Sequence, residues 1–75
     1  MKGYRYKRFR EVRKNRGYTQ KEVALFLGMD RTQYSRYERG RVEIPLRIAV
    51  EFAKRMFVSI DYLVGLTDVD IFDPF

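Results

Sequence analysis

The chain has 75 residues, enough for one small domain, and we expect no second domain that binds an inducer or is cleaved. It contains neither Cys nor His. This excludes disulfides, metal binding through thiolate or imidazole ligands, and catalysis by a Ser–His or Cys–His pair. We therefore expect no metal, no cofactor and no enzymatic activity. The net charge of +6 is unevenly distributed, because residues 1–55 hold all 16 Lys and Arg while residues 56–75 hold four Asp and no base. The basic part of the chain indicates either a polyanionic partner such as nucleic acid or a solvated basic face.

The N-terminal segment MKGYRYKRFR is basic but has no apolar stretch behind it, so it does not have the form of a signal peptide. No apolar run approaches the roughly 18 residues of a membrane span, and we therefore expect a cytoplasmic protein that does not enter a membrane. Residues 1–8 are either a basic arm or the start of the first helix. A cluster of eight bases extends from this segment into the first predicted helix, and it either keeps the protein soluble or adds phosphate or minor-groove contacts to a duplex. Its members are Lys2, Arg5, Lys7, Arg8, Arg10, Arg13, Lys14 and Arg16.

Two helices are predicted before residue 28. Apolar residues at helical spacing predict a first helix over about 6–16, and Gly17 follows it in a position that favours the left-handed conformation. Thr19 with Glu22 three residues later forms a capping box that opens a second helix. Gly28 ends that helix after about two turns.

A third helix is predicted from Asp30 to Gly40. Asp30 is a favourable N-cap, and Gln33 at the third helical position makes a second capping box. Tyr34 and Tyr37 lie three residues apart and should face the core. Stacking of these two rings on unpaired bases is the alternative, but their spacing favours the core.

Two further helices complete the predicted fold. Pro45 suits the first turn of a fourth helix with a broad apolar stripe, and Ser59 caps a short fifth helix that Gly65 ends. Residues 66–75 form an acidic and apolar tail whose Asp68, Asp70 and Asp73 lack the glycine and the terminal Glu of a calcium loop. The pattern therefore predicts an all-α fold of five short helices without a metal site.

The second and third predicted helices are joined by a short turn that contains Gly, as in a helix-turn-helix, where two helices cross steeply. Their apolar faces should pack together, so that Arg31, Thr32, Ser35 and Arg36 project from the first two turns of the third helix. Arg can donate two hydrogen bonds to guanine, and Thr and Ser can contact several base edges. The amide of Gln20, at a helix N-terminus, suits a phosphate oxygen.

The segments TQKEVALFLGMDRTQYSRYERG and AKRMFVSIDYLVG resemble the Cro/CI-type (Xre-family) helix-turn-helix regulators over about residues 9–65. The resemblance implies a compact, five-helix, lambda-repressor-like DNA-binding domain. It rests on residues that fall in register with the family pattern: Gln20, Ala24, Gly28, Ser35, Glu38, Gly40, Ala53 and 61–63.

The resemblance also implies roles for single residues. Arg31, Thr32 and Arg36 should read bases, with Ser35 at the DNA surface. Gln20 should bind a backbone phosphate and also support the first residue of the third helix. Further phosphate contacts should come from Gln33, Arg13, Arg39 and Arg41. Arg13 should in addition form a scaffold salt bridge with Glu38. The chain departs from the family at Phe57, where a glycine is usual.

These features predict a sequence-specific, double-stranded DNA-binding repressor that acts as a homodimer on an inverted repeat. Candidate dimer residues are the apolar ones towards the C-terminus, namely Phe57, Leu63, Leu66, Ile71 and Phe72. Two alternatives remain. The first is a DNA-binding antitoxin whose tail binds a toxin, and the second is a protein-interaction module that uses the same fold without DNA.

Overall fold

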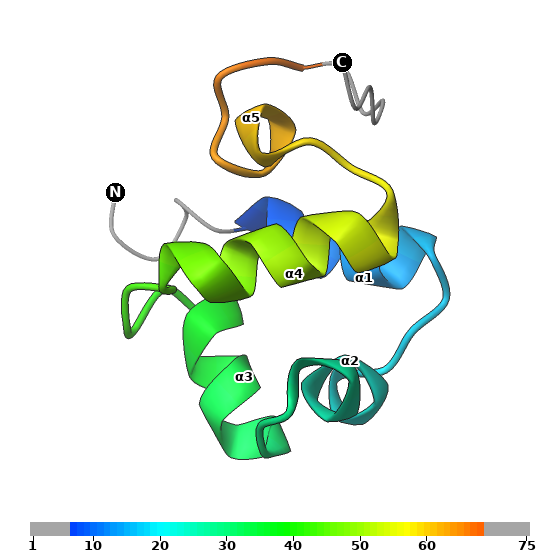
Figure 1. The fold of residues 1–75 in the computed structure, drawn as a ribbon, viewed down its shortest axis with the longest axis vertical. Coiled ribbons are helices and arrows are strands. Elements are labelled where there is room, and N and C mark those ends of the chain that lie inside the picture. The colour runs from blue at the N-terminus through cyan, green and yellow to red at the C-terminus, as the bar shows by residue number, and fades with distance from the viewer. Residues whose placement is uncertain (1–6, 69–75) are drawn as a thin grey trace.

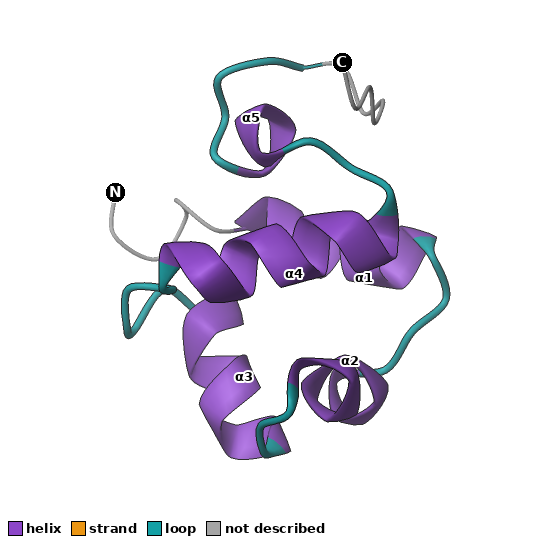
Figure 2. Cartoon of the chain, in the orientation of Figure 1, coloured by secondary structure: helices purple, strands orange, loops and turns teal. Residues whose placement is uncertain are grey.

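The computed structural model describes residues 7–68, and within this range the chain forms five α-helices and no strand (Figures 1 and 2). The prediction of an all-α, five-helix fold is confirmed. None of the described helices is long and apolar enough to cross a membrane. In chain order the helices are α1 (Lys7–Asn15), α2 (Gln20–Leu27), α3 (Arg31–Glu38), α4 (Leu46–Met56) and α5 (Ile60–Leu63).

The helices are arranged around α1 and α4, which occupy the middle of the molecule (Figure 1). The α2–α3 pair lies on one side of them, and α5 lies on the opposite side. Helix α1 contacts both α3 and α5, and α4 contacts both α2 and α5. The two faces of the molecule are therefore separated by a central layer that touches both of them.

The core lies between the helices and contains aromatic rings from three of them. Phe52 of α4 meets Phe9 of α1 with the ring centroids 4.7 Å apart, and it stacks on Tyr34 of α3 at 6.4 Å. Tyr34 and Tyr37 are both buried, as the helical spacing predicted. The core cluster comprises Phe9, Val12, Val23, Ala24, Tyr34, Ala49, Phe52, Ala53, Met56, Val58 and Leu63.

The ends of α2 follow the sequence prediction. The backbone N–H of Glu22 donates to the Thr19 hydroxyl at 3.1 Å, and the Thr19 N–H donates to the Glu22 carboxylate at 2.8 Å. This reciprocal pair is the predicted capping box. Gly28 ends the helix with φ of +73°, which is the left-handed conformation that glycine adopts without strain.

The cap of α3 differs from its prediction in one half. Asp30 accepts a hydrogen bond from the backbone N–H of Gln33 at 2.8 Å, as expected for an N-cap. The Gln33 amide, however, donates to the Tyr37 hydroxyl at 2.9 Å. The predicted second capping box is therefore wrong in its return bond, because the bond to Tyr37 directs the Gln33 side chain one turn along the helix, whereas the return bond needs its amide oxygen at the Asp30 N–H.

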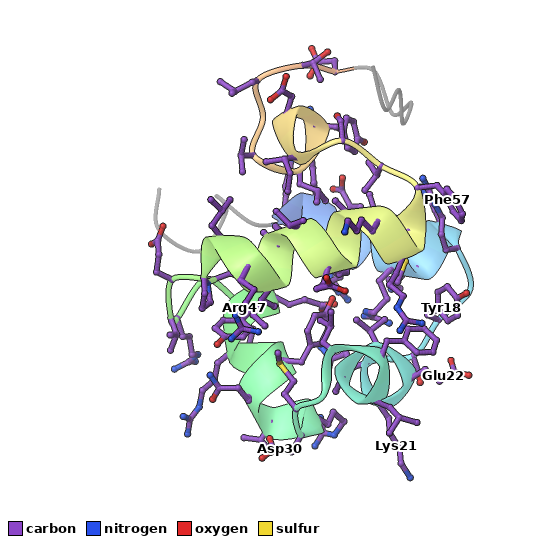
Figure 3. The ribbon with its side chains drawn as sticks, in the orientation of Figure 1. Tyr18, Lys21, Glu22, Asp30, Arg47 and Phe57 are labelled. Atoms are coloured by element: carbon purple, nitrogen blue, oxygen red, sulfur yellow. The ribbon has the colours of Figure 1, made fainter. Side chains whose placement is uncertain are left out.

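Helix α4 differs from the prediction at its N-terminal end, and its C-terminal end is formed by the residue that departs from the family pattern. Pro45 is the N-cap residue rather than part of the first turn. Phe57 ends the helix in the left-handed conformation with φ of 55°, and its side chain is 70% exposed (Figure 3). Arg16 closes the same end by donating from its guanidinium to the carbonyl oxygen of Met56 at 2.9 Å. The chain thus makes, with an aromatic residue, a turn for which glycine is favoured.

Arg8 holds α1 to the segment that follows α5. Its guanidinium donates to the carbonyl oxygen of Tyr62 at 2.9 Å and to the Asp68 carboxylate at 2.6 Å, and also bonds the carbonyl of Thr67. The same group lies over the Tyr62 ring, 4.3 Å from its centroid. Residues 62–68 are therefore fixed against the first turn of α1.

One of the predicted dimer residues is excluded by its position. Leu63 is fully buried in the core, because the short helix α5 turns this side chain inward, so it is not available to a partner. Phe57 and Leu66 are exposed at 70% and 77% and keep that possible role. Ile71 and Phe72 lie outside the described residues.

The backbone at Phe57 leads to a test of stability. We expect Phe57→Gly to raise the free energy of unfolding by about 0.5–1 kcal/mol, because relief of the left-handed strain exceeds the extra chain entropy of glycine. Urea denaturation measures the change. Gly28→Ala is the matched control, since it places a side chain in the same backbone region with open space around it and should lower the stability. A loss of stability in Phe57→Gly would contradict the argument.

Candidate nucleic-acid interface

The turn between α2 and α3 sets the direction in which α3 is presented. Met29 donates its backbone N–H to the carbonyl of Ala24 at 3.0 Å, so the chain folds back over the last turn of α2 before Asp30 starts the next helix. Ala24 is buried, and its small side chain permits close approach of the two helices. Tyr34 and Tyr37 point inward, and Arg31, Thr32 and Arg36 are exposed on the side away from the core.

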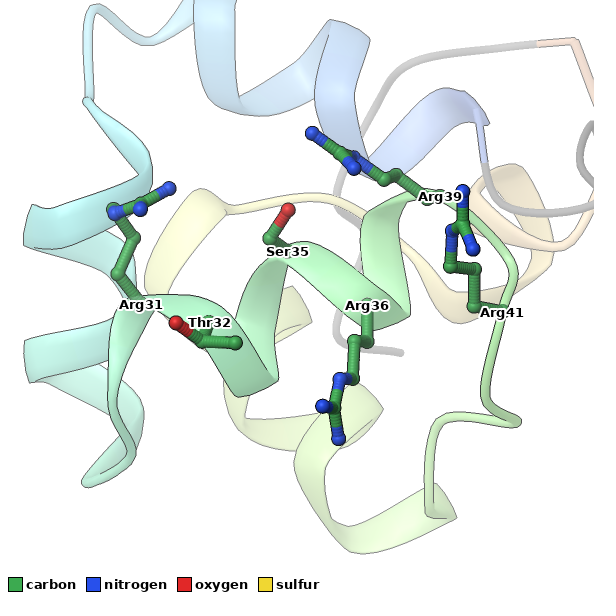
Figure 4. Close-up of a pocket in the computed structure, with 6 residues that line it drawn as sticks. All are labelled: Arg31, Thr32, Ser35, Arg36, Arg39 and Arg41. Carbon is green, nitrogen blue, oxygen red and sulfur yellow. The ribbon is translucent and has the colours of Figure 1, made fainter.

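The outward face of α3 forms a hollow of about 400 Å³, which we call the α3 hollow (Figure 4). It brings together all four predicted base-reading residues and two of the predicted phosphate contacts. Its lining consists of Arg31, Thr32, Ser35, Arg36, Arg39 and Arg41. In Figure 4, Arg31 lies at one end, and Arg39 and Arg41 lie at the other. A hollow lined by four guanidinium groups and two hydroxyls, with no carboxylate in its lining, favours an anionic ligand.

The lining residues differ in how far they can reach. Arg31, Thr32 and Arg36 are exposed, so their side chains can extend to a ligand outside the hollow. Ser35 is only 8% exposed, and it forms part of the floor of the hollow between the longer side chains. A ligand would therefore reach Ser35 only by close approach to the helix itself.

A buried ion pair joins α1 to α3, the helix that carries most of the hollow. The Arg13 Nε donates to Glu38 Oε2 at 2.6 Å, and the two side chains are 10% and 2% exposed. Arg13 also donates from Nη1 to the carbonyl oxygen of Tyr18 at 2.8 Å. The scaffold pair that the resemblance implies is thus present in the structure, and it ties the C-terminal turn of α3 to α1.

Gln20 extends this pair to the other end of α3. Its amide nitrogen donates to Glu38 Oε1 at 3.0 Å, and its amide oxygen lies 3.4 Å from the guanidinium of Arg31. One carboxylate therefore binds side chains from α1 and α2, and Gln20 in turn supports the first residue of α3. Neither the capping pattern nor the helical spacing indicated the Gln20–Glu38 bond, because the two residues are 18 positions apart.

The predicted phosphate contacts differ in whether their donor groups are already bound within the protein. The guanidinium of Arg13 is occupied by Glu38 and Tyr18, which favours its scaffold role over a phosphate contact. Gln20 uses one of its two amide hydrogens and retains the other. The Gln33 amide is bound to the Tyr37 hydroxyl and would have to exchange that bond for one with a phosphate.

The Tyr34 hydroxyl is buried next to this network. It makes no hydrogen bond with any of the described residues. Burial, and after it the neighbouring Glu38 carboxylate, raises the pKa of this hydroxyl far above its ordinary value, so it stays neutral. Among residues 7–68 no group of three or more acidic side chains is placed to hold a metal ion.

The sequence is similar to that of known helix-turn-helix proteins. A model of the helix-turn-helix family matches residues 9–63. Three relatives from Bacillus subtilis (strain 168) are each 36% identical to the chain. The first is the SPbeta prophage-derived uncharacterized HTH-type transcriptional regulator YonR, which matches over 56 residues. The others are the uncharacterized HTH-type transcriptional regulator YobD, which matches over 61 residues, and the HTH-type transcriptional regulator ImmR, which matches over 63. These matches cover 75%, 81% and 84% of this chain. The chain spans about half the length of these relatives, with 52%, 54% and 50% covered.

Removing one partner of the buried ion pair should have a large effect on stability. We expect Glu38→Ala to lower the free energy of unfolding by about 3–5 kcal/mol, because it leaves the Arg13 guanidinium buried and unpaired. Glu38→Gln should cost less, since it keeps an oxygen acceptor. Urea denaturation of each variant measures the change. Glu51→Ala, at an exposed position of α4, is the control and should stay within about 0.5 kcal/mol of wild type. A comparably small change in Glu38→Ala would show that the pair contributes little.

Proposed function

The chain belongs to the Cro/CI-type (Xre) helix-turn-helix family, and from this premise we propose that it binds double-stranded DNA in a sequence-specific manner as a transcriptional regulator. The observation that carries the proposal is the α3 hollow, which gathers two Arg, one Thr and one Ser from the second helix of the motif and two further Arg from the residues that follow it. In a helix-turn-helix this helix enters the major groove. Its side chains are of the types that bind base edges there.

Within this proposal, Arg31, Thr32, Ser35 and Arg36 contact bases. The two guanidinium groups suit guanine O6 and N7, and the Thr32 methyl suits the methyl group of thymine. Ser35, on the floor of the hollow, contacts the base edge that comes closest to the helix. The support of Arg31 by Gln20 restricts its side chain before binding, which reduces the entropy lost on contact.

Phosphate contacts in the proposal come from the ends of the motif. Arg39 and Arg41 extend the positive surface past the last turn of α3. Gln20 offers its second amide hydrogen at the N-terminus of α2, where backbone N–H groups also face outward. Such contacts orient the domain on the duplex and carry no sequence information.

The finer proposal is a repressor that acts as a homodimer on an inverted repeat. A single motif reads few base pairs, whereas two copies read half-sites about one helical turn apart. The exposed side chains of Phe57 and Leu66 are the candidates for the contact between copies. Repression would be steric, through occupation of a promoter. We further propose a cytoplasmic protein without enzymatic activity.

The proposal is tested by selection from a pool of randomised duplex DNA at several salt concentrations, followed by sequencing of the bound molecules. An enriched inverted repeat with half-sites about one turn apart would support a dimeric regulator. Enrichment of a single half-site would support sequence-specific binding and refute the dimer. Salt-sensitive binding without any enriched sequence would refute base readout by α3, and would turn attention to a protein partner.

The role of Arg36 can be measured with the selected site. We expect Arg36→Ala to weaken binding by about 1–3 kcal/mol and to relax discrimination at one base position, because it removes a bidentate donor. Affinities for the selected site and for its single-base variants are compared by titration. Lys54→Ala, at an exposed position on α4, is the control for loss of one positive charge. An equal loss of affinity for all sequences would assign Arg36 to phosphate instead.

A further inference from the structure

The basic residues in and just after α1 divide into two groups in the structure. Arg8, Arg13 and Arg16 each turn inward to bind groups of the protein itself, namely the segment after α5, the Glu38 carboxylate and the end of α4. The other three described bases of this region are exposed, and these are Lys7, Arg10 and Lys14. The second group is available to an external partner.

The exposed group forms one stripe, which we call the α1 stripe. Residues 7, 10 and 14 are separated by three and four positions, so they lie on a single face of a helix. At about 100° per residue, Arg10 lies about 60° around the helix from Arg13 and about 160° from Arg8. Arg13 points to α3 and Arg8 to α5. Arg10 therefore borders the side of α1 that faces α3, whereas Lys7 and Lys14 lie about midway between the α3 side and the α5 side, at roughly 100–120° from both Arg13 and Arg8.

The α1 stripe lies on a helix that is held against α3. The Arg13–Glu38 bond holds α1 against the last turn of α3, and the next residue along the chain is Arg39, which lines the α3 hollow. Helices α1 and α3 are in contact, and in Figure 4 the Arg39 side chain extends toward the ribbon of α1. The exposed bases of α1 and the arginines of the α3 hollow are thus carried by two helices that are held in contact, with Glu11 as the exposed acid of α1 beside the α1 stripe.

We propose that Lys7, Arg10 and Lys14 bind backbone phosphates of duplex DNA beside the bases that α3 contacts. This inference rests on the proposed function and adds a second DNA-binding surface outside the helix-turn-helix. The α1 stripe spans about 10 Å at 1.5 Å per residue. A stripe of this length is long enough to lie along a short run of neighbouring phosphates of one DNA strand.

The chemistry of the α1 stripe indicates affinity rather than sequence preference. Two of its three members are Lys, whose flexible ammonium groups bind phosphate as point charges. All three sit on one side of a helix that offers no side chain to the α3 hollow. They would therefore release counterions from any duplex, and they would leave the choice of base to α3.

The test compares the wild-type chain with the triple variant Lys7→Gln, Arg10→Gln and Lys14→Gln, in which glutamine keeps the helix propensity. Dissociation constants for the selected site and for a scrambled duplex are measured from about 50 to 200 mM salt. We expect the slope of log K against log salt to become shallower by about 2–3 on both duplexes, at about 0.9 per contact. The ratio of the two affinities should not change.

Matched variants separate this effect from a general loss of charge. Arg10→Gln and Lys54→Gln each remove one positive charge from an exposed helix position. The first should make the slope shallower by about 0.9, and the second should leave it unchanged. Circular dichroism of every variant checks that the helices are intact.

Each outcome decides between the inference and the proposed function. An unchanged slope in the triple variant would refute the α1 stripe as a phosphate surface, even if the wild-type chain prefers its selected site. A changed ratio between the duplexes would also refute it, because the residues would then act on base recognition. If the wild-type chain shows no sequence preference, the proposed function fails, and the slope on scrambled DNA still decides whether the α1 stripe binds phosphate.

Discussion

An ion pair between Arg13 and Glu38, buried where α1, α2 and α3 meet, supports the candidate interface. Charges removed from water are stable only when they are paired and their remaining hydrogen-bonding groups are satisfied. Here the carboxylate receives bonds from Arg13 and Gln20, and the guanidinium also binds a backbone carbonyl. These directional bonds favour one arrangement of the three helices. The position of α3 on the protein surface therefore depends on this group of side chains.

The outward face of α3 is polar because the inward face takes both of its aromatic residues. Tyr34 packs on Phe52 in the core, and the hydroxyl of the buried Tyr37 accepts a hydrogen bond from the amide of Gln33. What remains on the outside is a run of guanidinium and hydroxyl groups around the α3 hollow. The division of one eight-residue helix between a core face and a polar face leads directly to the proposed contact with DNA.

Basic residues serve two purposes in this small domain. Some stabilise the fold from within: Arg16 closes the C-terminal end of α4, and Arg8 fastens the segment after α5 to α1. Others, such as Arg10, remain in solvent and extend the positive surface. The count of 16 Lys and Arg therefore overstates the number of bases that are free to meet a polyanion. At Phe57, the bond from Arg16 to the carbonyl oxygen of Met56 helps to close a turn that lacks the favoured glycine.

The sequence by itself determined the helices, the motif and the residue types of the interface, because these depend on local signals. Capping residues such as Thr19 and Asp30, turn residues such as Gly28, and the period of the apolar positions act within a few residues of the chain. Only the tertiary structure decided which long side chains turn inward, because a guanidinium chooses among partners that are far apart in sequence. The burial of Leu63, the bond from Gln20 to Glu38 and the separation of Arg8 from Arg10 all follow from packing between helices, which no local pattern records.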